Sequence, residues 1–136
     1  MRVGLVAASP QVGEKFTNLK KMEVYIEQAD ADLLIFGELF LTGFGEPNQL
    51  RAYAEKTDGK SIKKAKRLAK KYKKHLIFGC PVREGNKIYN SALFVHPDGK
   101  IDSYFKNYLP DFPQPTEKIV FTSGKGPKVL IHLSEK

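Results

Sequence analysis

The sequence predicts an α/β fold in which helices cover at least the outer face of a mixed β-sheet. One observation is an apolar run, a helical segment and a second apolar run that follow one another within residues 2–38, the pattern of a βαβ unit with parallel strands. Another is a pair of apolar runs on either side of Asp-Gly-Lys at 98–100, which predicts an antiparallel hairpin. The length of 136 residues also suits one domain with a real core.

The first half of the chain supplies the expected βαβ unit. Residues 2–9 (RVGLVAAS) are predicted to form a strand, and residues 14–30 a helix with apolar residues at mostly helical spacing. The run DLLIFGE at 32–38 follows directly and has the composition of a buried parallel strand. Glycines and a proline mark 41–48 as a loop, and we expect a short helix at 49–56.

The second half supplies the antiparallel part of the sheet. HLIFGCPV at 75–82 is predicted to be a strand, and 87–97 is predicted to pair with it after a turn. Residues 101–109 are predicted to form the partner strand of the hairpin. The proline-rich segment 109–118 is expected to be a loop, and KVLIHLS at 128–134 a last strand.

A basic segment carries much of the net charge of +8. Within residues 60–75, apolar residues recur at helical spacing, and lysines fill most of the other positions. The apolar residues include Ile62, Ala65, Ala69 and Tyr72. This pattern favours an amphipathic surface helix with a solvated basic face over a nucleic-acid site, because Tyr72 lies on the apolar face and would not stack on bases. A basic nucleic-acid-binding protein that uses 60–75 is the last-ranked alternative.

Composition argues against several other classes of protein. No apolar run approaches the length of a membrane span, and the N-terminus lacks the long apolar stretch of a signal peptide, so we expect a cytoplasmic protein without membrane partners. The single cysteine, Cys80, allows neither an internal disulfide nor a cysteine-based metal cluster. The histidines show no metal-ligand spacing: His75, His96 and His132.

Three charged residues stand where chemistry could occur. Glu38 ends the 32–38 strand, and sites in open α/β sheets lie outside the carboxyl ends of parallel strands. Burying a carboxylate there is costly unless it is paired, so position alone leaves a capping glutamate and a functional one equally open. Lys106 ends a strand and Glu117 lies in the proline-rich segment. Taken singly, both are typical of solvated surface residues.

The order and context of these residues resemble the nitrilase (carbon–nitrogen hydrolase) superfamily. The resemblance rests on Glu38 within IFGELFLTGF, Lys106 within YFKNYLP and Glu117 ahead of FTSG. The segments RVGLVAAS, HLIFGCPVREGNKIYNS and IYNSALFVHPDGKI resemble other parts of the family in the same order. The resemblance runs from residue 2 to about residue 126.

The resemblance implies both a fold and an activity. The family fold is a four-layer αββα sandwich, of which residues 1–136 would be the N-terminal part, with helices on the outer face of a mixed sheet. The family hydrolyses or transfers non-peptide C–N bonds, as in small amides and nitriles, and uses no cofactor. Carried over, Glu38 would be the general base, Lys106 would stabilise the oxyanion, and Glu117 would be the second, positioning glutamate.

The nucleophile that the resemblance implies is missing. In the family a cysteine follows the strand that corresponds to 128–134, and this sequence ends at Lys136. Cys80 falls in the strand before Lys106 and is expected to be a small buried residue. We therefore expect the chain alone to be inactive until a longer product or a partner completes it.

A second expectation follows if residues 1–136 are only the N-terminal part of the four-layer family fold. The inner face of the sheet would then be bare, and a monomer rarely exposes an apolar face of that size. We therefore expect a homo-oligomer or a complementing C-terminal half. A non-catalytic small-molecule or protein-binding module that uses the Glu38 and Lys106 pocket remains an alternative.

Overall fold

The computed structural model describes residues 1–111 and 116–128. They contain a five-stranded sheet in which strand order follows the sequence. The first three strands pair in parallel and the last two pair antiparallel, so the predicted mixed sheet is confirmed. The strands are β1 (Val3–Val6), β2 (Leu33–Phe36), β3 (His75–Glu84), β4 (Lys87–Val95) and β5 (Ile101–Phe105).

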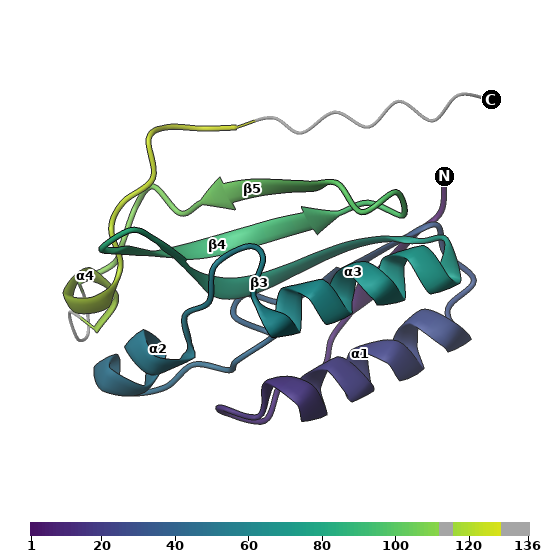
Figure 1. Cartoon of the computed structure of the whole chain (residues 1–136), viewed down its shortest axis with the longest axis horizontal. Helices are drawn as coiled ribbons and strands as arrows, with labels where there is room; N and C mark the ends of the chain where they lie inside the picture. Colours follow the sequence, from purple (N-terminus) through teal and green to yellow (C-terminus); the bar gives the residue numbers. More distant parts are fainter. Residues whose placement is uncertain (112–115, 129–136) are drawn as a thin grey trace.

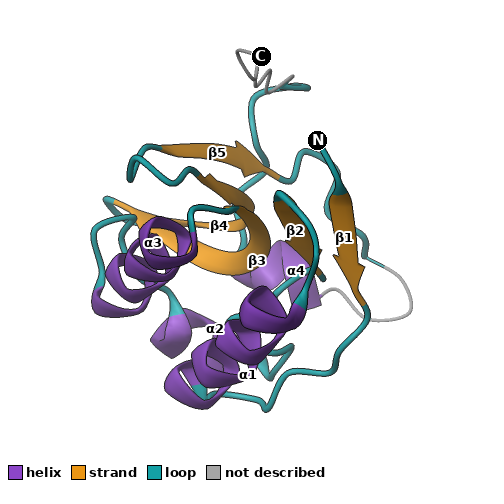
Figure 2. Ribbon diagram, turned by 90° about the vertical axis from the view of Figure 1, so that its right-hand side faces the viewer, coloured by secondary structure: helices purple, strands orange, loops and turns teal. Residues whose placement is uncertain are grey.

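The two long helices lie side by side on one face of this sheet (Figures 1 and 2). They are α1 (Lys15–Gln28) and α3 (Lys60–Tyr72). The short helices α2 (Pro47–Tyr53) and α4 (Thr116–Val120) contact each other at one end of the sheet (Figure 1). None of the helices in the described part of the chain is long and apolar enough to cross a bilayer.

The core lies between the sheet and the two long helices. Burial of apolar side chains is the main favourable term in folding, and it selects the apolar stripe of each helix. The buried residues of the helices and strands include Leu19, Met22, Ile26, Ile62, Ala65, Leu68, Leu34, Phe36, Leu76, Phe78, Leu93 and Val95. The predicted apolar face of α3 is therefore confirmed, and Tyr72 packs against the same cluster while its hydroxyl donates to Glu23.

The two long helices do not cover the opposite face of the sheet (Figure 2), which we call the uncovered face. Strand register places Leu5, Ile35 and Ile77 in one row on that face, and Ala92 and Tyr104 continue the face across β4 and β5. The side chain of Leu5 is 79% exposed, which is unusual for a leucine in a sheet. One sheet face is thus buried against the long helices, and the other carries apolar residues that range from the partly exposed Ile35 and Ile77 to the exposed Leu5.

Several predicted boundaries were wrong. The 32–38 strand ends at Phe36, because the chain turns at once through Glu38. The 101–109 strand ends at Phe105. The 109–118 loop gives way to α4 at Thr116, where packing against α2 overrides the nearby prolines. The predicted strand at 128–134 lies outside the described residues except for Lys128.

Candidate active site

The structure brings together the three charged residues that the sequence singled out. Glu38 lies in the turn after β2, Lys106 directly follows β5, and Glu117 lies in α4. The Lys106 ammonium donates to Glu38 Oε1 at 2.9 Å and to Glu117 Oε1 at 3.0 Å. One cation is therefore shared between two carboxylates, at the carboxyl end of β2 where α/β sheets commonly place their sites.

Sequence reasoning missed a fourth member of this cluster, Asn90 of β4. Its Nδ2 donates to Glu38 Oε1 at 2.6 Å and lies 3.5 Å from Glu117 Oε2. Asn90 is a polar residue in a mostly apolar strand, yet it is only 3% exposed. That contrast was the available signal, because a buried amide needs hydrogen-bond partners and a strand residue finds them only across the fold.

The two carboxylates use their oxygens differently. Glu117 accepts from Lys106 on Oε1 and from Asn90 on Oε2. Glu38 accepts both of its donors on Oε1, and its Oε2 has no hydrogen-bond partner within residues 1–111 and 116–128. The Glu38 side chain is 58% exposed, against 11% for that of Glu117. Glu38 therefore combines an exposed side chain with an oxygen that has no hydrogen-bond partner among the described residues.

The pairing keeps the central groups ionised. Burial raises the pKa of the Glu38 carboxyl, but the hydrogen bonds from Lys106 and Asn90 outweigh it and hold the pKa below its ordinary value. Burial lowers the pKa of Lys106, but its hydrogen bonds to Glu38 and Glu117 outweigh that effect and raise the pKa above its ordinary value. At neutral pH the site therefore presents a carboxylate base beside a fixed ammonium.

A close backbone contact fixes the turn that carries Glu38. A Cβ atom on Gly79 of β3 would lie 2.2 Å from the Leu39 nitrogen and 2.8 Å from the Glu38 Cα. Two backbone hydrogen bonds, Gly79 N to Gly37 O and Leu41 N to Gly79 O, hold the turn against the strand. Leu39 adopts a φ of 52°, in the left-handed region that non-glycine residues rarely use. A side chain at position 79 would overlap the Glu38 turn, so this turn requires a glycine there.

A second glycine allows a close backbone approach beside Lys106. A Cβ atom on Gly124 would lie 2.2 Å from the carbonyl oxygen of Phe105. The Gly124 nitrogen donates to the Lys106 carbonyl at 2.9 Å, and the Lys106 nitrogen donates to the Asn90 carbonyl at the same distance. The backbone of Lys106 is thus held from both sides.

A cavity of about 390 Å³ opens beside the cluster. Glu38, Asn90 and Lys106 line it, and its floor belongs to the uncovered sheet face, with Ile77 and Tyr104 among the lining residues. The candidate groups therefore lie at the border between the charged cluster and the apolar face.

Cys80 lies on the other side of the sheet. It pairs in register with Ser91, whereas Gly79 pairs with Ala92 on the uncovered face, and successive side chains of a strand point to opposite faces. Cys80 is 1% exposed, and burial raises the pKa of its thiol to about 12. It is therefore the small buried residue that the sequence predicted, and neither its location nor its pKa suits a nucleophile.

Comparison with known proteins finds relatives along most of the chain. The chain is 31% identical over 132 residues to a protein of Schizosaccharomyces pombe named as a probable nitrilase, and the match covers 90% of this chain and 47% of that protein. It is 28% identical over 123 residues to the protein N-terminal amidase of Saccharomyces cerevisiae, covering 82% of this chain and 27% of the amidase. The chain thus spans half or less of the length of these relatives.

Solved structures show the same fold. A CN-hydrolase superfamily protein of Xanthomonas campestris superposes with a TM-score of 0.82 at 24% identity, over 93% of this chain and 47% of that one. An N-terminal amidase superposes with a TM-score of 0.77 at 28% identity, over 91% of this chain and 31% of that one. The family model for carbon–nitrogen hydrolases matches residues 2–134, and the chain therefore belongs to the carbon–nitrogen hydrolase family.

Proposed function

We propose that this chain supplies the base and the oxyanion-stabilising cation of an amidase- or nitrilase-like enzyme. The substrate would be a small amide or nitrile with a non-peptide C–N bond. The observation that carries the proposal is the Lys106 ammonium shared by two carboxylates. Of these two, only Glu117 has hydrogen-bond partners on both oxygens among the described residues, whereas Glu38 has an exposed side chain and a free Oε2. This asymmetry supports a role as base for Glu38 and a holding role for Glu117.

The proposed reaction follows the charges of the site. Glu38 Oε2 takes the proton of a cysteine thiol, and the thiolate attacks the amide carbonyl carbon. Lys106 stabilises the negative oxygen of the tetrahedral intermediate. Glu38 then gives its proton to the leaving amine as the C–N bond breaks. In a second half-reaction Glu38 deprotonates a water molecule, which hydrolyses the thioester and releases the acid and the thiol. No cofactor enters these steps.

In this proposal the thiol comes from outside residues 1–136. Cys80 is the only cysteine among the 136 residues, and it lies buried on the helix-covered side of the sheet. We propose that a second layer covers the apolar sheet face and brings the nucleophilic cysteine to the cavity edge. A complementing C-terminal half, in a longer product or a separate chain, fits this role, and a second copy of this chain would supply the cover but not the cysteine. The chain alone would then be inactive, and its proposed location is the cytoplasm.

One observation favours a second candidate function. The described site has a base and a cation but no nucleophile, which suits a non-catalytic module that binds a small amide or amine between Glu38 and Lys106. Such a module would bind amides without turnover.

Ammonia release from a panel of small aliphatic amides and nitriles tests the proposal. We would assay the chain alone and the chain completed by a C-terminal segment that carries the cysteine. We expect no turnover from the chain alone and turnover after completion, lost in Glu38→Gln and kept in Glu27→Gln, an exposed glutamate of α1. Amide binding without turnover in the completed protein would support the binding module instead. Turnover that survives Glu38→Gln would overturn the proposed mechanism.

A further inference from the structure

Asn90 is the one neutral side chain that reaches both carboxylates of the cluster among the described residues. It lies in the middle of β4, where it is 3% exposed and where the sheet holds its backbone on both sides. A buried amide in this place would be costly unless its hydrogens were used. Its two nearest acceptors are Glu38 Oε1 at 2.6 Å and Glu117 Oε2 at 3.5 Å.

The two carboxylates would repel each other without such a bridge. Lys106 neutralises only one of the two negative charges, so the cluster of Glu38, Glu117 and Lys106 carries a net charge of −1 when all three are ionised. Asn90 adds partial positive charge between the acids without adding a proton that can leave. Because it shares Oε1 of Glu38 with Lys106, it also decides which oxygen of Glu38 stays unpartnered.

Asn90 also contacts Lys106, the third charged residue of the cluster, through its backbone. Its carbonyl accepts from the Lys106 nitrogen at 2.9 Å, directly after the last residue of β5. One residue of the central hairpin thus contacts Glu38 and Glu117 through its side chain and Lys106 through its backbone. No other residue in the described part of the chain makes hydrogen bonds to all three.

We propose that Asn90 is a positioning residue, which turns the Glu38 carboxylate so that Oε1 faces Lys106 and Oε2 remains free to take a proton. The inference rests on the proposed function for the meaning of that free oxygen, but the orientation itself can be tested without turnover. Asn90 touches no reacting atom in this scheme, and its effect reaches the chemistry only through Glu38 and Glu117.

The experiment is a carbon-13 NMR titration of the Glu38 carboxyl in the full chain, with the Asn90→Leu variant and, should that variant not fold, Asn90→Ser. Leucine keeps the approximate volume and removes both donors. We expect the Glu38 pKa to rise in either variant, because a donor is lost and the repulsion from Glu117 remains. Ser91→Ala is the matched control: Ser91 is the adjacent buried polar residue, but it contacts Cys80 on the other face. It should leave the Glu38 titration unchanged.

Kinetics of the completed enzyme provide the second readout. Misplacement of the base should lower kcat by about 10²-fold while KM changes little. A raised Glu38 pKa with no turnover in any protein would uphold the positioning role and reject the proposed function. Normal turnover and an unchanged Glu38 pKa in folded Asn90 variants would overturn the inference and leave the proposed function standing. If neither Asn90 variant folded while Ser91→Ala did, Asn90 would be a structural residue, and the inference would fail.

Discussion

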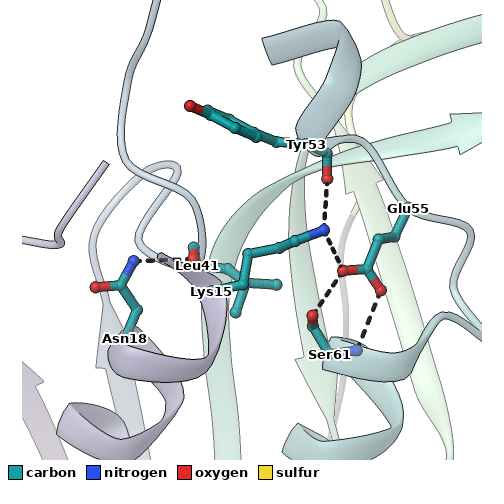
Figure 3. Close-up of polar contacts among 6 residues, drawn as sticks. All are labelled: Lys15, Asn18, Leu41, Tyr53, Glu55 and Ser61. Carbon is teal, nitrogen blue, oxygen red and sulfur yellow. Dashed lines mark hydrogen bonds and ion pairs between the residues drawn. The ribbon is translucent and has the colours of Figure 1, made fainter. Parts of the chain in front are cut away.

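Two glutamate–lysine clusters lie on opposite sides of the sheet, and they differ in how completely their polar atoms are used. On the helix-covered side, the Lys15 ammonium donates to Glu55 Oε1 and to the Tyr53 carbonyl (Figure 3). Ser61 donates its hydroxyl to Glu55 Oε1 at 2.6 Å and its backbone nitrogen to Oε2 at 3.1 Å. Both oxygens of Glu55 therefore have partners, whereas one oxygen of Glu38 has none in the part of the chain that the structure describes.

The two clusters also differ in solvent exposure, and the glutamate with the free oxygen is the more exposed one. The Lys15 and Glu55 side chains are 21% and 16% exposed, while that of Glu38 is 58% exposed. Glu55 joins the start of α1, the start of α3 and, through its backbone, β3. A glutamate–lysine pair is thus common to both clusters. The proposed site differs in having a second carboxylate, an oxygen without a partner among the described residues, and access from solvent.

The largest expected effect is on turnover. In the completed enzyme, Glu38→Gln or Lys106→Met should lower the rate of ammonia release by about 10³-fold, because the base or the oxyanion partner is lost. In Glu38→Gln the free energy of unfolding should change by no more than about 1 kcal/mol, since the Glu38 end of the pair is exposed. Lys106→Met should cost more, because it leaves the largely buried Glu117 carboxylate without its cation. Initial rates and urea denaturation measure the effects on turnover and on stability. A stability loss in Glu38→Gln as large as that of a Glu55 variant would remove the distinction between the clusters.

The Glu55 cluster should show the reverse behaviour. Glu55→Ala is expected to lower the free energy of unfolding by about 3 kcal/mol, because it strands the Lys15 ammonium in a largely buried place. Glu23→Ala is the control, since it leaves the ammonium of Lys71, whose side chain is 62% exposed, to solvent and should cost about 1 kcal/mol or less. Urea denaturation compares them, and the Glu38 titration should stay unchanged in both. Equal losses in the two variants would contradict the structural role of Glu55.

Two glycines offer a sharper probe of the site. Gly79→Ala should displace the Glu38 turn and lower the free energy of unfolding by about 2 kcal/mol, because the new Cβ overlaps the turn backbone. Gly37→Ala lies next to Glu38 in sequence, but its Cβ would meet nothing within 4 Å, so its effect should be small. Thermal unfolding and the Glu38 titration report on both. Equal tolerance of the two substitutions would mean that Gly79 does not hold the turn.

The pH dependence of stability has a defined sign for each group. The pKa of Glu38 is lowered from 4.5, so its stabilising effect is complete above pH 4.5 and is lost as the pH falls through the lowered pKa. The pKa of Lys106 is raised from 10.5, so its effect is complete below pH 10.5 and is lost as the pH rises through the raised pKa. Denaturation of wild type and Glu38→Gln across the acid range should diverge only above the lowered pKa.

The smallest effect is expected at Cys80. Because burial raises the pKa of its thiol to about 12, a thiol reagent should react with it only on unfolding. Cys80→Ala should leave turnover of the completed enzyme unchanged. Fast labelling of the native chain, or loss of turnover in this variant, would bring Cys80 back as a candidate nucleophile.

The local elements could be predicted because their signals are periodic. Apolar spacing identified both long helices and every described strand, and the Asp-Gly turn identified the hairpin. The prediction failed where elements end or where tertiary contacts decide. Helix α4 begins in a proline-rich segment because its residues pack against α2. Glu38 leaves the strand early because Gly79 lets the turn close against β3.

The sequence by itself determined the mixed α/β sheet, the amphipathic basic helix and the candidate residues Glu38, Lys106 and Glu117, because these follow from periodicity and from motifs in a fixed order. Only the tertiary structure decided that Lys106 lies between both acids, that Asn90 joins them and that Cys80 faces away. The physical reason is distance along the chain. Hydrogen bonds between residues tens of positions apart depend on strand register and backbone approach, and neither leaves a local pattern.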